Sequence, residues 1–205
     1  MSTTNTTVRN AAVAALAAGL LLLTGCGKSA PTHFYSLNAA AKSEAAPAGP
    51  CMSVGVGPVD FPAYLDRAQI VTRGGGNRMQ LAEFDQWIET PRENFQRVLT
   101  ENIAGLVCAK PLVTYPWPTG GHPDRQVVIQ VARFDGVIGQ DAVLRASWSV
   151  LDADGANLAW NTNEYRETAA GPDYDALAAA QSRLVEKFAK DVAASLAGNG
   201  NAKGK

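Results

Sequence analysis

Apolar residues recur at two different spacings along this chain, and the spacings separate predicted strands from predicted helices. Residues 127–134 are mostly apolar or β-branched, and residues 142–150 place an apolar side chain at every second position. Both patterns are typical of strands with at least one buried face. An Asp-Ala-Asp-Gly turn at residues 152–155 then leads into residues 158–165. Together these segments predict an antiparallel meander of three strands.

Shorter strands are predicted in the first half of the chain. Residues 52–56 alternate apolar with small side chains up to Pro58, and the glycines suggest that another backbone approaches closely. Residues 69–73 and 78–81 flank a Gly-Gly-Gly-Asn turn, which is typical of a β-hairpin. Residues 33–37 also have strand character, and we expect them to pair with the main sheet.

Two segments repeat their apolar residues at helical spacing. Thr90 is the expected N-cap of a helix whose first residue is Pro91, and Glu93 supplies the carboxylate of a capping box. Pro111 would end any continuation of this helix. Its apolar stripe, interrupted by one asparagine, consists of Phe95, Val98, Leu99, Asn102, Ile103 and Leu106.

The second helix is predicted to follow the Gly-Pro-Asp sequence at residues 171–173 and to stop at Gly198. Its expected buried face consists of Leu177, Leu184, Val185, Phe188, Val192 and Leu196. Strands and helices do not alternate strictly along the chain, and two helices can cover one face of a sheet. The pattern therefore predicts an α+β fold, with a mostly antiparallel β-sheet and two amphipathic α-helices packed on one face.

The amino-terminal residues resemble a secretory leader that ends in a lipid-attachment cysteine. Arg9 precedes an uncharged apolar run at residues 11–23, and this run is shorter than the about 20 residues that a membrane-spanning helix needs. Two small residues then precede Cys26. The pattern predicts a lipoprotein signal peptide at residues 1–25 and acylation of the Cys26 sulfur. The alternative is an ordinary secreted protein with a chance cysteine.

The rest of the chain is interpreted as one domain with irregular segments at its ends. Residues 26–31 would form a lipid-anchored tether, and residues 32–198 a single α+β domain. Residues 39–50 are rich in Ala and Pro, so we expect a flexible connection there. Residues 199–205 are expected to form a disordered tail.

Charge and cysteine content narrow the possible partners and compartment. The chain has 18 basic and 19 acidic side chains and a net charge of −1, and loss of the leader removes only one base, leaving 17 against 19, or −2. No basic stripe indicates a nucleic-acid partner. Cys51 and Cys108 match no zinc or redox motif, so an oxidising compartment favours a disulfide between them. Two buried free thiols are the alternative.

Few residues offer catalytic or metal-binding chemistry. His33 and His122 are the two histidines, and the sequence contains no zinc-binding His pair, nucleophile elbow or phosphate-binding loop motif. The acidic residues Glu83, Asp85 and Glu89 are more typical of a solvated face than of the paired carboxylates of a glycosidase. We therefore expect a protein that is not an enzyme and that uses no metal or cofactor. A periplasmic hydrolase with an unrecognised site is the less favoured alternative.

Two aromatic residues stand between prolines in the middle of the chain. Tyr115 and Trp117 belong to a Tyr-Pro-Trp-Pro sequence, which fits an extended amphipathic loop that a partner could bind. In the alternative interpretation, these aromatic side chains cover the core.

A longer motif relates the chain to a known family. It consists of Gly-Pro-Val-Asp-Phe-Pro-Ala-Tyr-Leu-Asp-Arg-Ala-Gln-Ile-Val-Thr-Arg at residues 57–73, Asn77, and Leu-Ala-Glu-Phe-Asp-Gln-Trp at residues 81–87 before the capped helix. Phe-Tyr-Ser-Leu at residues 34–37 also fits. Through these residues the chain resembles the PqiC family of ABC-type transport auxiliary lipoproteins, over most of its length after the leader.

The resemblance implies an antiparallel sheet with two helices and an auxiliary role in an ABC/MCE-type intermembrane lipid transport system that supports membrane integrity. The implied partners are an MCE-type periplasmic protein with its ABC transporter or permease, and the outer membrane through the acyl chains. By resemblance to sorted lipoproteins, Gly27 in place of an aspartate after Cys26 favours the outer membrane over the inner one. Homo-oligomerisation is left open, and a structural envelope lipoprotein not coupled to transport is the alternative function.

Part of the family motif is a candidate docking surface for such a partner. Tyr and Arg are residue types favoured at the centres of interfaces. The candidates are Phe61, Tyr64, Leu65, Asp66 and Arg67, with the turn at residues 74–77 and the separate pair Tyr115 and Trp117. Alternatively, the motif serves folding, with Asp66 and Arg67 making local hydrogen bonds.

Overall fold

The computed structural model describes residues 30–40, 48–117 and 122–198. From Thr32 onward, the described residues belong to one compact unit. The predicted signal peptide, Cys26 and the predicted tail lie outside the described residues. Strand β2 begins at Ala48, inside the stretch 39–50 that the sequence suggested as a connection.

A five-stranded sheet forms the larger part of the fold, and its strands lie in the order β5-β2-β6-β7-β8. The central strand β6 is parallel to β2 and antiparallel to β7, and β8 closes the predicted meander. The bounds are Ala48–Asp60 for β2, Val107–Thr114 for β5, Arg125–Gly136 for β6, Asp141–Asp152 for β7 and Asn157–Thr168 for β8.

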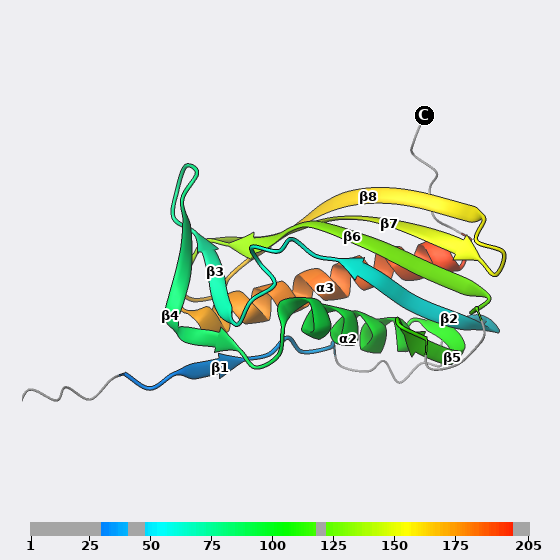
Figure 1. Cartoon of the computed structure of the whole chain (residues 1–205), viewed down its shortest axis with the longest axis horizontal. Helices are drawn as coiled ribbons and strands as arrows, with labels where there is room; N and C mark the ends of the chain where they lie inside the picture. Colours follow the sequence, from blue (N-terminus) through cyan, green and yellow to red (C-terminus); the bar gives the residue numbers. More distant parts are fainter. Residues whose placement is uncertain (1–29, 41–47, 118–121, 199–205) are drawn as a thin grey trace, which may run out of the picture. The chain divides into compact units, whose positions relative to one another are not determined.

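A second sheet of three strands has the order β1-β4-β3. Strands β3 (Gln69–Arg73) and β4 (Met79–Trp87) form the predicted hairpin, which extends at one end of the view in Figure 1. The short strand β1 (His33–Tyr35) pairs with β4 and not with the five-stranded sheet, which corrects the expected pairing. Specific hydrogen bonds hold β1 there, because the Tyr35 hydroxyl donates to Asp85 of β4 and the backbone N–H of Ile88 donates to the Tyr35 carbonyl.

Both helices pack on one face of the five-stranded sheet (Figure 1). Helix α2 spans Pro91–Ala104 and helix α3 spans Tyr174–Leu196. The α+β class and the two sheet-covering helices are therefore confirmed. The sheets are mixed rather than purely antiparallel, because β2 is parallel to both β5 and β6 and β1 is parallel to β4. A long crossover that contains β3, β4 and α2 separates β2 from β5 and permits this parallel pairing.

Helix α2 begins at the predicted cap, and its buried Asn102 binds the segment that follows β1. Thr90 Oγ1 accepts from the backbone of Glu93, whose carboxylate accepts from the Thr90 hydroxyl at 2.9 Å. The Oδ1 of Asn102 accepts from the backbone N–H of Ala40 at 2.8 Å. This contact explains the asparagine within the apolar stripe. The prediction for Leu106 is wrong, because it lies after the helix end and is exposed.

Helix α3 contacts the sheet through one large aromatic residue and two polar anchors. Phe188 packs edge-on against Trp148 of β7, with ring centroids 5.3 Å apart. The indole N–H of Trp148 donates to Ser195 Oγ at 3.1 Å, and the hydroxyl of Tyr165 donates to Asp191 at 2.6 Å. The helix therefore buries its aromatic contacts without leaving these two polar groups unpaired.

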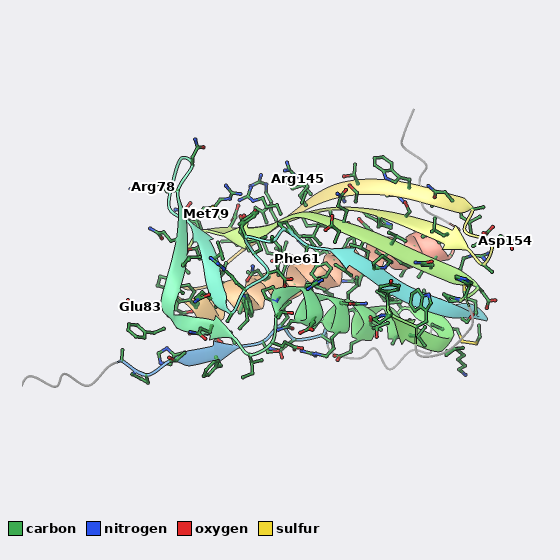
Figure 2. All side chains as sticks on the ribbon, in the orientation of Figure 1. Phe61, Arg78, Met79, Glu83, Arg145 and Asp154 are labelled. Carbon is green, nitrogen blue, oxygen red and sulfur yellow. A yellow bond between two sulfur atoms is a disulfide. The ribbon has the colours of Figure 1, made fainter. Side chains whose placement is uncertain are left out.

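The structure also contains strand β5, which the sequence did not predict. Its middle residue Pro111 had been interpreted only as a stop signal, although proline is tolerated in edge strands. Strand β5 pairs with β2 on one side only. A disulfide joins Cys51 of β2 to Cys108 of β5, with a Cα–Cα distance of 4.5 Å, and its sulfur atoms appear in Figure 2.

Replacing both bridged cysteines with serine should lower the free energy of unfolding by about 4 kcal/mol, because the bridge closes a long loop in the unfolded chain. Its sequence separation is 57 residues. Urea unfolding of the oxidised full-length chain, compared with the variant Cys51→Ser/Cys108→Ser, measures the loss. Dithiothreitol should reproduce the loss in the wild type and leave the double variant unchanged. Equal wild-type midpoints with and without dithiothreitol would contradict the prediction.

The side chain of Glu167 on β8 should contribute stability that depends on pH. Hydrogen bonds from Lys187 and Arg183 of α3 lower the pKa of Glu167 from its usual 4.5. The unfolded chain then binds the proton more tightly, so the contribution is present above the unfolded pKa and is lost as the pH falls through the folded value. The substitution Glu167→Gln should lower the free energy of unfolding by about 1 kcal/mol at pH 7, as expected for partly exposed ion pairs.

Urea unfolding at pH 7 and pH 3 tests this dependence, because the difference between wild type and Glu167→Gln should shrink at the lower pH. The matched control is Glu186→Gln, which removes the exposed pair of Glu186 with Lys190 within one helix. A difference of the same size at both pH values would rule out the proposed linkage.

Candidate functional site

The residues that follow β2 form a loop with two buried anchors. We call residues 61–68 the docking loop. The side chain of Phe61 is 8 % exposed and that of Leu65 is 3 % exposed. The centroid of the Phe61 ring lies 5.9 Å from the ring centroids of both Phe95 of α2 and Phe134 of β6. These two candidate docking residues therefore belong to the core, because their apolar side chains gain more from burial there than from exposure to solvent.

Hydrogen bonds hold the docking loop in one conformation. The backbone N–H groups of Leu65 and Asp66 both donate to the Pro62 carbonyl. The Asp66 carboxylate accepts from the backbone N–H of Arg92 at 3.3 Å and pairs with the Arg92 guanidinium at 3.0 Å. The positive end of the α2 dipole also stabilises the negative charge of Asp66 at the start of this helix. Asp66 thus makes the local bonds that the sequence left open.

Tyr64 and Arg67 remain available on the surface of the loop. Tyr64 is 43 % exposed, and Arg67 is exposed. Partial burial, and then the charge of Asp135, raise the pKa of the Tyr64 hydroxyl. The loop therefore presents one aromatic and one cationic side chain from a backbone that is held in place at both ends.

A buried carboxylate next to the loop joins the two sheets. Asp135 of β6 is fully buried and accepts from Arg73 of β3 at 2.9 and 3.0 Å and from Arg133 at 2.7 Å. The hydrogen bonds from Arg73 to Asp135 raise the pKa of this arginine. Sequence reasoning missed Asp135. The signal was an acid next to Phe134 in a strand with many apolar residues, because a carboxylate needs a cationic partner when it is buried.

Tyr115 and Trp117 lie apart from the docking loop, at the end of β5. Their rings are 5.4 Å apart in an edge-to-face arrangement, with Tyr115 exposed and Trp117 partly buried. A Cβ atom built on Gly55 would lie 2.5 Å from the Trp117 ring. The predicted close neighbour of this glycine is therefore an aromatic side chain and not another backbone. The backbone of Tyr115 donates to Val56, so these aromatics adjoin β2 upstream of Phe61.

The remaining polar candidates have local partners or stand alone. Asp85 accepts from Tyr35 at 2.7 Å and contacts His33 at 3.2 Å. Burial and the bond to Asp85 raise the pKa of Tyr35 to about 12. Glu89 pairs with Arg97, and Glu83 and His122 are exposed. Among the described residues, no group of three His, Cys, Asp or Glu side chains is placed to hold a metal ion.

The predicted lipidation site is outside the part of the chain that the structure describes. Cys26 thus remains a sequence-based expectation. In the described ranges no helix has the length and apolar character required to cross a membrane.

Comparison with known proteins finds relatives through a family model and through solved structures. The model of the ABC-type transport auxiliary lipoprotein component matches residues 35–193. A crystal structure of a DUF330 protein from Xanthomonas campestris is 16 % identical, covers 82 % of this chain and 96 % of its own, and has a TM-score of 0.68. The crystal structure of another, uncharacterized protein is 15 % identical, with coverages of 82 % and 99 % and a TM-score of 0.65.

No curated protein matches the chain in sequence. The two solved structures are similar in fold. The family match extends from the last residue of β1 to the final turns of α3, and therefore includes both sheets, both helices and the docking loop. The chain belongs to the family of ABC-type transport auxiliary lipoprotein components.

Proposed function

We propose that this protein is a lipid-anchored, non-catalytic subunit that couples the outer membrane to an MCE-type intermembrane lipid transporter. The observation that carries the proposal is the family match over residues 35–193, because that family is a transport auxiliary component and not an enzyme family. In this proposal the domain helps to maintain membrane integrity by holding the transport assembly at the membrane that receives or supplies lipid.

The anchor in this proposal is the acylated sulfur of Cys26. One acyl chain gives only marginal membrane binding, at about 0.8 kcal/mol for each buried CH₂ group, whereas the three chains implied by the lipoprotein signal would bind stably. Anchoring keeps the domain at a high effective concentration near its partner, so a modest intrinsic affinity is sufficient. A small docking patch is compatible with this requirement.

The docking loop supports the proposal through its rigidity and its exposed side chains. The buried anchors Phe61 and Leu65 and the pairing of Asp66 with Arg92 order the loop before a partner arrives. Binding then costs little additional conformational entropy. Tyr64 and Arg67 are the exposed side chains that we assign to the MCE-type periplasmic protein or its permease.

Substitution of Cys26 by serine should release the protein from the membrane, because serine offers no thiol for the diacylglycerol. Density-gradient fractionation of envelopes should find the wild type with the outer membrane and Cys26→Ser in the soluble fraction. Mass spectrometry of the amino-terminal peptide should show acyl mass in the wild type only.

The double variant Cys51→Ser/Cys108→Ser is the matched control for this experiment, since it removes sulfur atoms without touching the proposed anchor. It should fractionate as the wild type does. A wild-type peptide without acyl mass would refute the anchor, and fractionation with the inner membrane would refute the outer-membrane assignment.

The variant Tyr64→Ala/Arg67→Ala should reduce recovery of the transport partner by about tenfold or more, because interface tyrosines and arginines often contribute above 1 kcal/mol each. The measurement is co-purification from detergent-solubilised envelopes, with an MCE-domain protein and a permease identified by mass spectrometry.

The matched control is Trp160→Ala/Arg125→Ala, which removes an exposed aromatic and an arginine from β8 and β6. Its partner recovery should equal that of the wild type. Unchanged recovery with Tyr64→Ala/Arg67→Ala would show that the docking loop is not the interface, and recovery of no MCE-type protein by the wild type would overturn the proposed partner.

A further inference from the structure

Three arginines meet on the face of the five-stranded sheet that the helices leave uncovered. Arg133 of β6 lies directly opposite Arg145 of β7, and Arg166 of β8 lies opposite Val143 of β7. A register shift between Val131 and Arg133 interrupts the alternation of β6. Such a bulge re-aims the side chains that follow it. It directs Phe134 into the core and places Arg133 and Asp135 on the opposite face, where Arg73 of β3 covers Asp135.

The pairing of Arg133 with Arg145 is unfavourable by itself. Like charges directly opposite each other in an antiparallel pair lie roughly 5 Å apart at Cβ and destabilise the sheet. Arg145 is exposed (Figure 2) and makes no hydrogen bond or ion pair with another described residue. Two neighbouring acids already have partners, because Asp135 binds Arg73 and Arg133, and Glu164, which lies opposite Arg145 on β8, binds Arg166.

The guanidinium groups of these arginines keep donors that no described residue uses. Arg133 bonds to Asp135 through Nε alone, and its side chain is only 21 % exposed. Arg166 bonds to Glu164 through one terminal nitrogen. An arginine has five N–H donors, so most of the donors in this cluster are free for an acceptor. Cationic donors of this kind form stronger hydrogen bonds with a charged acceptor than with a neutral one.

An open pocket of about 410 Å³ lies beside these arginines, and Arg133 and Arg166 line it while Arg145, directly opposite Arg133, does not. Its floor includes Val143, which is 1 % exposed although it does not belong to the main hydrophobic core. The carboxylate of Asp141 also lines the pocket and accepts from Thr168 at 2.7 Å. Including Arg73, four guanidiniums in this neighbourhood face the three carboxylates of Asp135, Asp141 and Glu164. Among the residues that line the pocket itself, Arg133 and Arg166 outnumber the one acid, Asp141, and Val137 and Val143 are apolar.

We propose that Arg133, Arg145 and Arg166 form a binding site for a phosphate group. A phosphate presents three oxygens in different directions, so guanidiniums from three neighbouring strands can each donate to it. A planar carboxylate is satisfied by one arginine fork and one additional donor, as Asp135 is by Arg73 and Arg133. The apolar floor has room for the carbon atoms of a phosphate ester. The same chemistry is offered by free phosphate and by a phospholipid headgroup.

An NMR titration of the full-length chain in neutral detergent tests this site directly, by following the arginine side-chain Nε–H signals. Inorganic phosphate is the first probe and short-chain phosphatidylglycerol the second. Signals of the three arginines should shift saturably with at least one probe. The variant Arg145→Gln should weaken that binding by about tenfold, as expected for loss of a charge-assisted contact. This variant removes no hydrogen bond made by another described residue, so the fold should be retained.

The matched control is Arg125→Gln, which removes the same charge at the opposite end of β6. Its affinity should stay within about twofold of the wild type, since it lies outside the cluster. Tighter binding of phosphatidylglycerol assigns the site to a headgroup, and equal or tighter binding of inorganic phosphate assigns it to the free ion. The proposal is overturned if neither probe shifts these signals, if both variants weaken binding equally, or if an oligoglutamate peptide binds more tightly than either probe. None of these outcomes depends on the docking partner.

Discussion

The arrangement of the two sheets depends on one carboxylate that has no contact with solvent. Asp135 lies between the guanidiniums of Arg73 and Arg133, and these bonds join the hairpin of β3 and β4 to the centre of the larger sheet. Removing one partner of such a group typically costs 3–5 kcal/mol, as a rough figure, because the remaining charge stays buried without compensation. Apolar residues in place of Asp135, Arg73 and Arg133 could give a fold of equal stability. They would not specify the position of β3, because they make no directed hydrogen bonds.

Both surfaces with an assigned role adjoin this buried group. The docking loop runs from the end of β2 to the start of β3, so the position of β3 determines where Tyr64 and Arg67 are presented. On the other side, the bond from Arg133 Nε to Asp135 orients a guanidinium whose terminal nitrogens bond to no other described residue. One internal ion cluster thus positions the proposed protein-binding surface and the proposed anion-binding surface in the same part of the domain.

Local patterns in the sequence predicted most of the secondary structure for a clear reason. The cap at Thr90, the glycine-rich turn after β3 and the meander from β6 to β8 depend on residues close together in the chain. Strand β5 was missed because it is an edge strand with a proline, and its pairing partner lies far away in the sequence. The same distance hid the role of Trp117, which follows β5 and packs over Gly55 of the neighbouring strand β2.

By itself the sequence determined the α+β class, the helix boundaries within a few residues, and the family, because these follow from periodicity, capping chemistry and a contiguous motif. Only the tertiary structure decided which motif residues face solvent. Phe61 and Leu65 are buried while Tyr64 is exposed, although all three stand in the same loop. It also decided the parallel pairings and the meeting of Arg133, Arg145 and Arg166, since register and a bulge arise between strands that are distant in the chain. Periodicity predicts which face of a regular helix or strand is buried, but burial within an irregular loop and the pairing of distant strands depend on nonlocal packing.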